Sequence, residues 1–190
     1  MDDIWHDEKG DLAQLMLSDL YATIDECQTF GVKYAVIHAI IGMDNHHPTP
    51  LGLERLEAVV DYAVKKNVFL AFENTEGEEY LEAIMNHFAD VGNVGFCFDS
   101  GHEMCYNYSR NILGKYADRL FVTHLNDNMG MTGEELTFYD DSHLLPFDGV
   151  GDWQNIAKRI TDSGYNGTLS FEVISKGRPE RDTHSIYRNL

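Results

Sequence analysis

The stretch Asn93-Val-Gly-Phe-Cys-Phe-Asp-Ser-Gly-His102 contains the most informative strand of the chain. Its mostly apolar segment, 94–98, is typical of a strand that is buried on both faces, which indicates a parallel sheet covered by helices. The strand stops at Asp99, and His102 follows three residues later, so both side chains can point into one small volume beyond the strand end. That arrangement suits a metal ligand and a neighbouring partner. The alternative is that Asp99 caps the following helix.

Four other apolar segments end in the same way, on an acid or a histidine. The expected strands lie within 32–38, 68–73, 94–99, 119–124 and 168–173. Helical spacing of apolar residues predicts helices over 11–30, 51–66, 80–89, 103–117 and 152–162. The strands end on His38, Glu73, Asp99, His124 and Glu172. Because the active sites of α/β proteins lie beyond the carboxyl ends of the strands, these side chains form one candidate site.

Strands that alternate with helices specify a parallel sheet with right-handed crossovers. Ligands from five successive strands converge if the sheet curls into a barrel, whereas an open sheet would spread them apart. We therefore expect an α/β fold, a partial (β/α)8 TIM barrel of about five βα units, in one domain over residues 1–190. Val36 and Phe171, expected on the inner faces of the edge strands, should be exposed or covered by a partner chain. Exposed edges also favour a homo-oligomer.

Charge and composition argue against several classes of function. The chain has 14 Lys and Arg against 32 Asp and Glu, a net charge of −18 that would repel duplex DNA, and no basic patch is visible. No run approaches the roughly 18 apolar residues of a membrane span, and the N-terminus does not resemble a signal peptide. Three scattered cysteines without CxxC spacing fit a reducing cytoplasm. A cytoplasmic protein without membrane or nucleic-acid partners is expected.

Five motifs carry a resemblance to a known family. They are Phe72-Glu-Asn-Thr75, Phe98-Asp-Ser-Gly-His102, Thr123-His-Leu-Asn-Asp-Asn128, Asp141-Ser-His-Leu-Leu-Pro-Phe-Asp-Gly149 and Ser170-Phe-Glu172. In order and spacing they resemble the xylose isomerase-like barrels, and more narrowly the bacterial sugar phosphate isomerase/epimerase group, which is related to ketose 3-epimerases, inosose dehydratases and endonuclease IV. The family barrel has eight strands and the match begins after the third, which implies that the first three strands are missing here.

The resemblance implies one divalent metal ion held by Glu73, Asp99, His124 and Glu172. Glu73 and Glu172 would also be the acid/base pair, and His102 would touch the hydroxyls or the carbonyl of the substrate. The residue types agree, because three carboxylates and one imidazole form a hard site suited to Mn²⁺, Mg²⁺ or Co²⁺, with Zn²⁺ as a further possibility. A metal that chelates a carbonyl and the neighbouring hydroxyl acidifies the α C–H bond and stabilises the enediolate.

Further residues are candidates for a second metal or for substrate contact. Endonuclease IV-like enzymes have additional ligands that would fall on His38, His102, Asp141 and His143, although a loop with ordinary polar residues is the alternative for the last two. Those enzymes also have a histidine on the third strand, which has no counterpart here.

Other positions bear on the substrate and on the loop behind the site. Lys176 and Arg178 follow the last strand, where barrel enzymes often bind phosphate, but a solvated loop explains them more simply. Gly130 stands where ketose 3-epimerases carry an arginine, six residues beyond the metal histidine. Asn126 and Asp127 are expected to order the loop behind the last histidine ligand.

The sequence therefore indicates a divalent-metal-dependent sugar or sugar-phosphate isomerase or epimerase. It would abstract a proton next to a carbonyl, through a metal-bound enediolate, with a small sugar or sugar phosphate as its partner. Dehydration uses the same metal and base and stays open. Two alternatives remain: an endonuclease IV-like abasic-site DNA nuclease, which the net charge of −18 opposes, and an inactive barrel fragment or partner subunit.

Overall fold

The computed structural model describes residues 1–43, 47–131 and 133–174. At its centre is a parallel sheet of five strands in the order β1-β2-β3-β4-β5. The strands are β1 (Tyr34–His38), β2 (Phe69–Glu73), β3 (Val94–Asp99), β4 (Leu120–Leu125) and β5 (Leu169–Phe171). The predicted positions, order and direction of the strands are confirmed.

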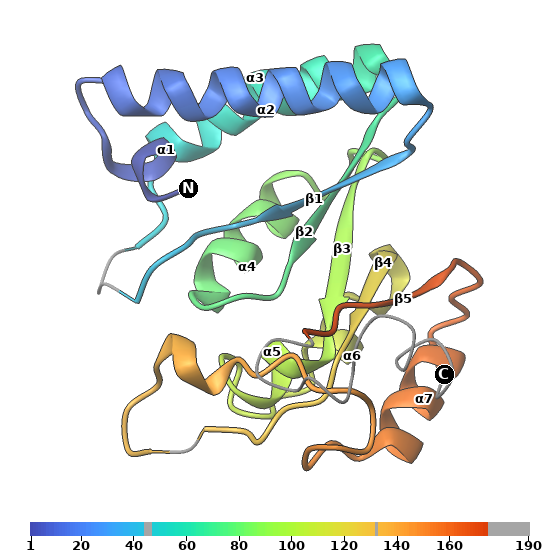
Figure 1. Cartoon of the computed structure of the whole chain (residues 1–190). Helices are drawn as coiled ribbons and strands as arrows, with labels where there is room; N and C mark the ends of the chain where they lie inside the picture. Colours follow the sequence, from blue (N-terminus) through green and yellow to red (C-terminus); the bar gives the residue numbers. More distant parts are fainter. Residues whose placement is uncertain (44–46, 132, 175–190) are drawn as a thin grey trace.

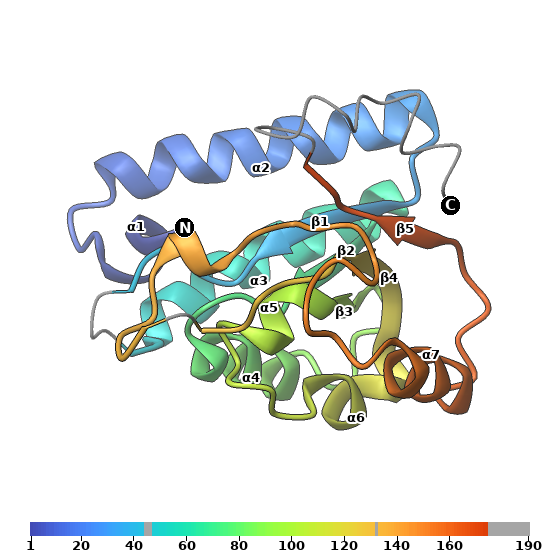
Figure 2. The ribbon, with the colours of Figure 1, turned by 60° about the horizontal axis from the view of Figure 1, so that its bottom comes forward.

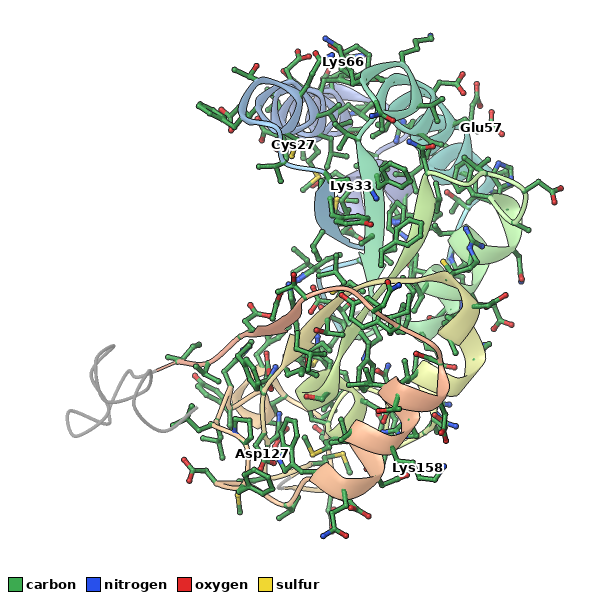
Figure 3. The ribbon with its side chains drawn as sticks, turned by 90° about the vertical axis from the view of Figure 1, so that its right-hand side faces the viewer. Cys27, Lys33, Glu57, Lys66, Asp127 and Lys158 are labelled. Carbon is green, nitrogen blue, oxygen red and sulfur yellow. The ribbon has the colours of Figure 1, made fainter. Side chains whose placement is uncertain are left out.

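The sheet curves into about half of a barrel, with helices packed along its convex side (Figure 1). In Figure 3 the molecule forms an open arc that carries α2 and α3 at one end and α7 at the other. The helices are α1 (Asp2–His6), α2 (Asp11–Phe30), α3 (Pro50–Lys66), α4 (Glu78–His87), α5 (Ser100–Met104), α6 (Ile112–Tyr116) and α7 (Trp153–Asp162), with short 3-10 turns at Ala117–Arg119 and Phe138–Asp140. Within the described ranges, no helix has the length and apolar character that crossing a membrane requires.

Local signals explain where the main helices begin and end. The side chain of Thr49 accepts a hydrogen bond from the backbone N–H of Gly52 and so caps α3, in which Pro50 occupies the first turn. Asn67 ends the same helix in the left-handed conformation with a φ of 55°. The apolar face of α3 (Leu56, Val59, Val60 and Ala63) is buried in the core. The helices therefore cover the convex face of the sheet and leave the strand ends free for polar side chains.

One predicted helix, 103–117, is wrong. The structure has two short helices instead, α5 and α6, because Tyr108 and Ser109 adopt positive φ angles of 54° and 55° that interrupt the helix. The carboxylate of Glu103 begins α6 by accepting a hydrogen bond from the backbone N–H of Ile112, at 2.9 Å. The spacing of apolar residues across 103–117 does not show where one helix ends and the next begins.

The expected placement of Phe171 on the inner face is also wrong. Ser170 is in register with His124 and faces inward, so its neighbour Phe171 lies on the convex side, where it is 40% exposed. Val36 lies on the inner face as predicted and is half-buried. The concave face of the half-barrel borders a hollow of about 540 Å³, which Val36 helps to line.

Candidate metal centre

The carboxyl ends of the strands bring four of the predicted ligands together. His38 pairs with Glu73 across β1 and β2, and Asp99 pairs with His124 across β3 and β4. Glu172 directly follows β5 and donates its backbone N–H to the carbonyl of Leu125 at 3.1 Å. One ligand atom from each member of the set lies within 4.8 Å of the others; this quartet consists of Glu73, Asp99, His124 and Glu172.

His124 lies between the two glutamates of the quartet. Its Nδ1 atom is 3.2 Å from Glu73 Oε1 and 2.8 Å from Glu172 Oε2. The side chain of Glu73 is only 2% exposed, whereas that of Glu172 is 45% exposed. Glu73 therefore forms the floor of the site and Glu172 forms its accessible side.

Asp99 is held on both of its carboxylate oxygens. Its Oδ1 accepts a hydrogen bond from the backbone N–H of His102 at 2.7 Å, so that Asp99 caps α5 as the alternative interpretation predicted. Its Oδ2 accepts a hydrogen bond from Asn126 Nδ2 at 2.8 Å. Because each carboxylate oxygen has two lone pairs, capping leaves acceptor capacity directed at the rest of the quartet. The cap fixes this side chain at the site, and the two interpretations are compatible.

The carboxylates and histidines of this site shift one another's pKa values. Burial raises the pKa of Glu73, but hydrogen bonds from His102, His124 and His38 outweigh burial and hold that pKa well below its usual range. Burial lowers the pKa of His124, but its hydrogen bonds with Cys97, Glu172 and Glu73 raise it well above the usual range. In the absence of an ion, the carboxylates and histidines of the site thus favour one another's charged forms.

In Asp99, unlike Glu73, the effect of burial on the pKa prevails over that of the neighbouring histidine. Complete burial raises its pKa to about 6, with the nearby His102 acting against that rise. A cation next to Asp99 would relieve this penalty, because opposite charge favours the ionised carboxylate.

A second group of possible ligands joins the quartet through His102. One ligand atom each from His102, Asp141 and His143 lies within 4.8 Å of the others. Asp141 Oδ2 is 3.2 Å from His102 Nε2 and 2.9 Å from His143 Nε2. The other ring nitrogen of His143, Nδ1, donates to the backbone carbonyl of Glu172 at 3.0 Å. The long segment between β4 and α7 carries two of these residues, and it lies across the ends of the strands in Figure 2.

The residues present fit a divalent cation. The quartet supplies three carboxylates and one imidazole, which is the donor set of a hard metal site. One buried polar atom of the second group, Asp141 Oδ1, has no hydrogen-bond partner. Buried polar atoms in native structures are nearly always satisfied, so an unpaired atom beside an acidic cluster indicates room for a ligand or an ion.

The remaining predicted site residues are placed less centrally. His38 Nε2 is 3.3 Å from Glu73 Oε2, but His38 belongs to none of the three candidate ligand groups found in the described part of the chain, and its side chain is 41% exposed. Lys176 and Arg178, the candidates for phosphate binding, lie outside the described residues.

The loop behind His124 is ordered by the two residues expected to do so. Asn126 binds Asp99, as described above, and Asp127 is fully buried. Asp127 Oδ1 accepts the backbone N–H of Gly151 at 2.9 Å, and its Oδ2 accepts the indole N–H of Trp153 at 2.8 Å. Figure 3 labels Asp127 in this lower part of the arc. The loop is thereby tied to the start of α7.

Three residues near the site were not predicted. Asn74 binds both backbone groups of Asp99, accepting from its N–H at 2.7 Å and donating to its carbonyl at 2.8 Å. The ring of Tyr106 lies 4.9 Å from that of His102, centroid to centroid. Cys97 forms a third candidate ligand group with Glu73 and His124. Cys97 could have been found from the sequence, because it precedes Asp99 by two residues and so shares its face of the strand.

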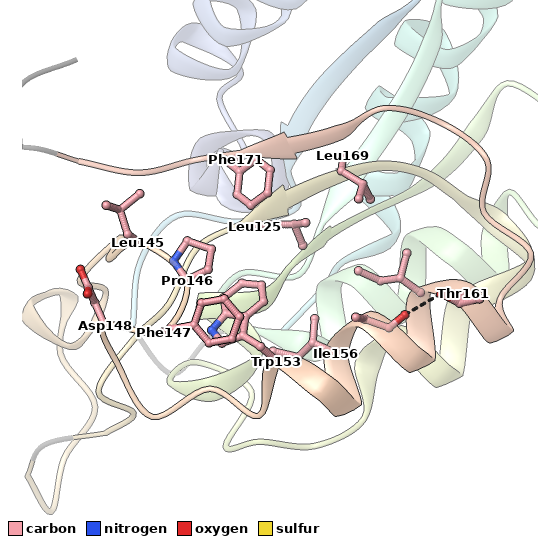
Figure 4. A pocket seen from close by; sticks show the side chains of 12 residues that line it. Leu125, Leu145, Pro146, Phe147, Asp148, Trp153, Ile156, Thr161, Leu169 and Phe171 are labelled. Atoms are coloured by element: carbon pink, nitrogen blue, oxygen red, sulfur yellow. Dashed lines mark hydrogen bonds between the residues drawn. The ribbon is translucent and has the colours of Figure 1, made fainter. Parts of the chain in front are cut away.

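A largely apolar pocket lies elsewhere, between β5 and α7 (Figure 4). It has a volume of about 510 Å³ and opens on the convex face. Its Trp153 indole donates to Asp127, and the Thr161 hydroxyl donates to the carbonyl of Ala157. Its lining therefore presents mostly apolar surface and engaged polar groups, unlike the quartet.

The comparison with protein families agrees with this geometry: the family described as xylose isomerase-like TIM barrel matches residues 4–188. The chain belongs to this family. A protein of Sinorhizobium fredii, named uncharacterized protein y4fM, is 32% identical over 187 residues, which cover 88% of this chain and 57% of the relative. The probable endonuclease 4 of Methanocorpusculum labreanum is 26% identical over 155 residues, covering 68% of this chain and 54% of that protein. The chain thus spans little more than half the length of these family members.

Solved structures of the family share the fold at low sequence identity. A D-tagatose 3-epimerase-like protein has a TM-score of 0.65 and 18% identity, over 88% of this chain and 66% of its own. An L-ribulose 3-epimerase has a TM-score of 0.61 and 19% identity, over 84% of this chain and 54% of its own. These likenesses confirm the partial TIM barrel.

Proposed function

We propose that this chain carries the metal-binding face of a divalent-metal-dependent sugar or sugar-phosphate isomerase or epimerase. The observation that supports the proposal is the quartet, in which ligand atoms of Glu73, Asp99, His124 and Glu172 lie within 4.8 Å of one another. Mn²⁺, Mg²⁺ or Co²⁺ suits this oxygen-rich set, and Zn²⁺ is an alternative. The similar structures named as 3-epimerases of small sugars support the same class of reaction.

The two glutamates would exchange protons with the carbon next to the substrate carbonyl. A hydrogen bond from His124 lowers the pKa of Glu172, so its carboxylate is ionised at neutral pH and can accept the proton. The 45% exposure of the Glu172 side chain gives a substrate access to it. Glu73, held on the other side of His124, would deliver a different proton, taken up from the solvent, to the opposite face of that carbon, while the proton accepted by Glu172 would pass to the solvent. A divalent ion bound by the quartet would polarise the carbonyl and the adjacent hydroxyl of the substrate and stabilise the developing enediolate.

His102 would hold a substrate oxygen. Asp141 fixes the ring through Nε2, at 3.2 Å, and the buried Nδ1 faces Glu73 Oε1 at 3.3 Å. A hydroxyl or carbonyl oxygen of a substrate bound beside Glu73 would lie within reach of this nitrogen. If a hydroxyl on the next carbon left instead of a proton returning, the same residues would catalyse dehydration, and product analysis distinguishes the two outcomes.

The test uses Glu172→Gln, which keeps an oxygen ligand and the size of the side chain but removes the base. We expect much of the bound Mn²⁺ to remain while turnover falls by at least about a hundredfold, the usual scale of general acid–base catalysis. Turnover is measured as solvent-deuterium incorporation into a panel of ketoses that includes D-tagatose and L-ribulose, each with and without phosphate. Wild-type protein that binds Mn²⁺ and exchanges no C–H proton of any ketose would contradict the proposal.

A second candidate function is hydrolysis of a phosphodiester at an abasic site. The observation that favours it is the second ligand group, His102, Asp141 and His143, because two neighbouring ions can stabilise both the attacking and the leaving oxygen. The relative named probable endonuclease 4 points the same way. The net charge of −18 disfavours contact with a DNA duplex.

Metal stoichiometry separates the two candidates. If the isomerase proposal holds, His143→Ala leaves the quartet ion bound and mainly raises the KM for the sugar. A loss of one ion from a chain that binds two or three, together with cleavage of an abasic duplex by the wild type, would instead favour the nuclease.

A further inference from the structure

A cysteine forms part of the wall of the candidate metal centre. Cys97 lies on β3 two residues before Asp99, so both side chains project from the same face of the strand. In the sheet Cys97 is in register with Glu73, and it is a free thiol with 0% exposure. Its sulfur lies within 4.8 Å of a ligand atom of Glu73 and of one of His124. We name Glu73, Cys97 and His124 the soft triad.

The other two cysteines are placed differently. Cys27 lies on α2 and is buried, and Cys105 accepts a hydrogen bond from Asn128 Nδ2 at 3.6 Å. Neither belongs to any candidate ligand group in the described residues. The Cys97 sulfur, by contrast, lies within 4.8 Å of ligand atoms of two other residues, Glu73 and His124. Its position therefore combines a thiol with two potential metal ligands, which packing alone does not require.

We propose that Cys97 gives this centre a second, alternative ligand set that selects thiophilic divalent ions such as Zn²⁺ and Cd²⁺. The inference rests on the proposed function only in that the soft triad and the quartet share Glu73 and His124. Hard ions prefer the carboxylate-rich quartet, whereas a sulfur, an imidazole and one carboxylate form a set that suits zinc and cadmium. Because two ligands are shared, one chain cannot fill both sets with separate ions independently.

Binding through the triad requires the thiolate. The S–H bond of Cys97 breaks, its proton passes to the solvent, and the sulfur electron pair forms the bond to the ion, so no oxidant or reductant is involved. An ion held in this way need not engage Asp99 or Glu172. Thiophilic ions would therefore displace the hard ion and inactivate the centre. The ratio of zinc to manganese would then set the fraction of the protein that is active.

The experiment compares wild-type protein with Cys97→Ser and Cys97→Ala, using Cys27→Ser as the matched cysteine control. Cd²⁺ is titrated into each protein and followed by the near-ultraviolet thiolate-to-cadmium charge-transfer band, and Mn²⁺ affinity is measured separately. We expect the band in the wild type and in Cys27→Ser and its loss in both Cys97 variants. Cd²⁺ affinity should fall at least about 10- to 100-fold in those variants, because the loss of even a supporting group of a metal site has an effect of that size. Their Mn²⁺ affinity should stay within about twofold of the wild type.

Two results would overturn the inference. One is a charge-transfer band that persists in the Cys97 variants, and the other is an equal loss of Cd²⁺ and Mn²⁺ affinity, which would make Cys97 a packing residue. Failure of the proposed function is seen separately, as wild-type protein that binds Mn²⁺ but exchanges no proton of a ketose. Cys97→Ala provides the answer if Cys97→Ser does not fold, because alanine places no hydroxyl in the buried position.

Discussion

The two ends of the concave face are built from the same strands and differ in every other respect. At the amino ends, the rings of Tyr34, Phe69 and Phe121 lie with centroids 5.6–5.7 Å apart. Lys33 Nζ lies 4.7 Å from the centroid of Phe69. At the carboxyl ends stand the carboxylates and imidazoles of the quartet. On β2, Phe69 at the aromatic end and Glu73 at the acidic end point to the same face and lie four residues apart, which is about 13 Å along the extended strand.

Because of this difference, we expect the aromatic end to contribute to folding stability and the carboxyl end to ion binding. The aromatic end gains from burial and ring contacts whatever the charge state of the protein. The carboxyl end gathers acids that repel one another and that are balanced here by neighbouring histidines, as the raised pKa of His124 indicates. We therefore expect changes at the carboxyl end to alter ion binding strongly, and changes at the aromatic end to alter folding stability without altering ion binding.

The largest effect is expected for Glu73→Gln. Glu73 is the shared acceptor of His38, His102 and His124, at 3.2–3.3 Å, and belongs to both the quartet and the soft triad. Because Glu73 is buried and in contact with three histidines, unlike the half-exposed Glu172, loss of its charge should weaken Mn²⁺ binding by at least about a hundredfold, the upper range for removal of even a supporting group in a metal site. Isothermal titration calorimetry measures the affinity.

Phe69→Leu is the matched control for this substitution, at the other end of the same strand. It should leave the Mn²⁺ affinity within about twofold, because distant sites act independently. In the wild type, Mn²⁺ at about 100 times its Kd should stabilise the fold by about 2.7 kcal/mol, and Glu73→Gln should cut that gain to about 0.4 kcal/mol or less at the same Mn²⁺ concentration. Equal affinities for Glu73→Gln and Phe69→Leu would show that the acidic end is not a cation site.

The sequence predicts those site residues that the order of strands along the chain is enough to bring together. Glu73, Asp99 and His124 were identified because a parallel sheet carries every strand end to the same edge, so that chain order alone places them together. Their ligand atoms lie within 4.8 Å of one another. The identity of the bound ion and the roles of the residues remain predictions.

Other features depend on geometry that one-dimensional patterns do not contain. Phe171 was placed on the wrong face because its strand is only three residues long, too short for alternation to fix which face is inside. The break between α5 and α6 was missed because left-handed φ angles at Tyr108 and Ser109 leave no apolar signature. The hydrogen bonds of Asn74 to Asp99 join different strands, and no spacing in the sequence encodes them.

A smaller effect is expected for Gly95→Ala, which tests the aromatic end. A Cβ atom on Gly95 would lie 2.4 Å from Cδ2 of Phe121, closer than packed atoms allow. We expect a loss of about 1–3 kcal/mol in the free energy of unfolding, the usual cost of overpacking, with unchanged Mn²⁺ affinity. Urea denaturation of Gly95→Ala, Phe121→Leu and the double variant measures the coupling. Rescue by Phe121→Leu supports the steric cause, whereas additive losses would contradict it.

The smallest effect is expected for His143→Asn, in metal-free protein. Burial lowers the pKa of His143, but its contacts with Asp141 and with the carbonyl of Glu172 outweigh burial and raise it to about 9. Because the folded state holds this proton more tightly than the unfolded chain, with its ordinary pKa of 6.5, the stabilising contribution is complete below pH 6.5. It is lost as the pH rises toward 9.

Asparagine suits the backbone at this position, since it tolerates the φ of 44° and can donate to the Glu172 carbonyl, but it carries no titrating charge. The stability difference between wild type and His143→Asn, measured by urea denaturation, should therefore shrink between pH 6.5 and 9. Asp141→Asn removes the carboxylate that raises the pKa and should move this loss of stability to lower pH. A pH-independent difference would show that His143 is neutral in the fold, and that charge does not hold the second ligand group together.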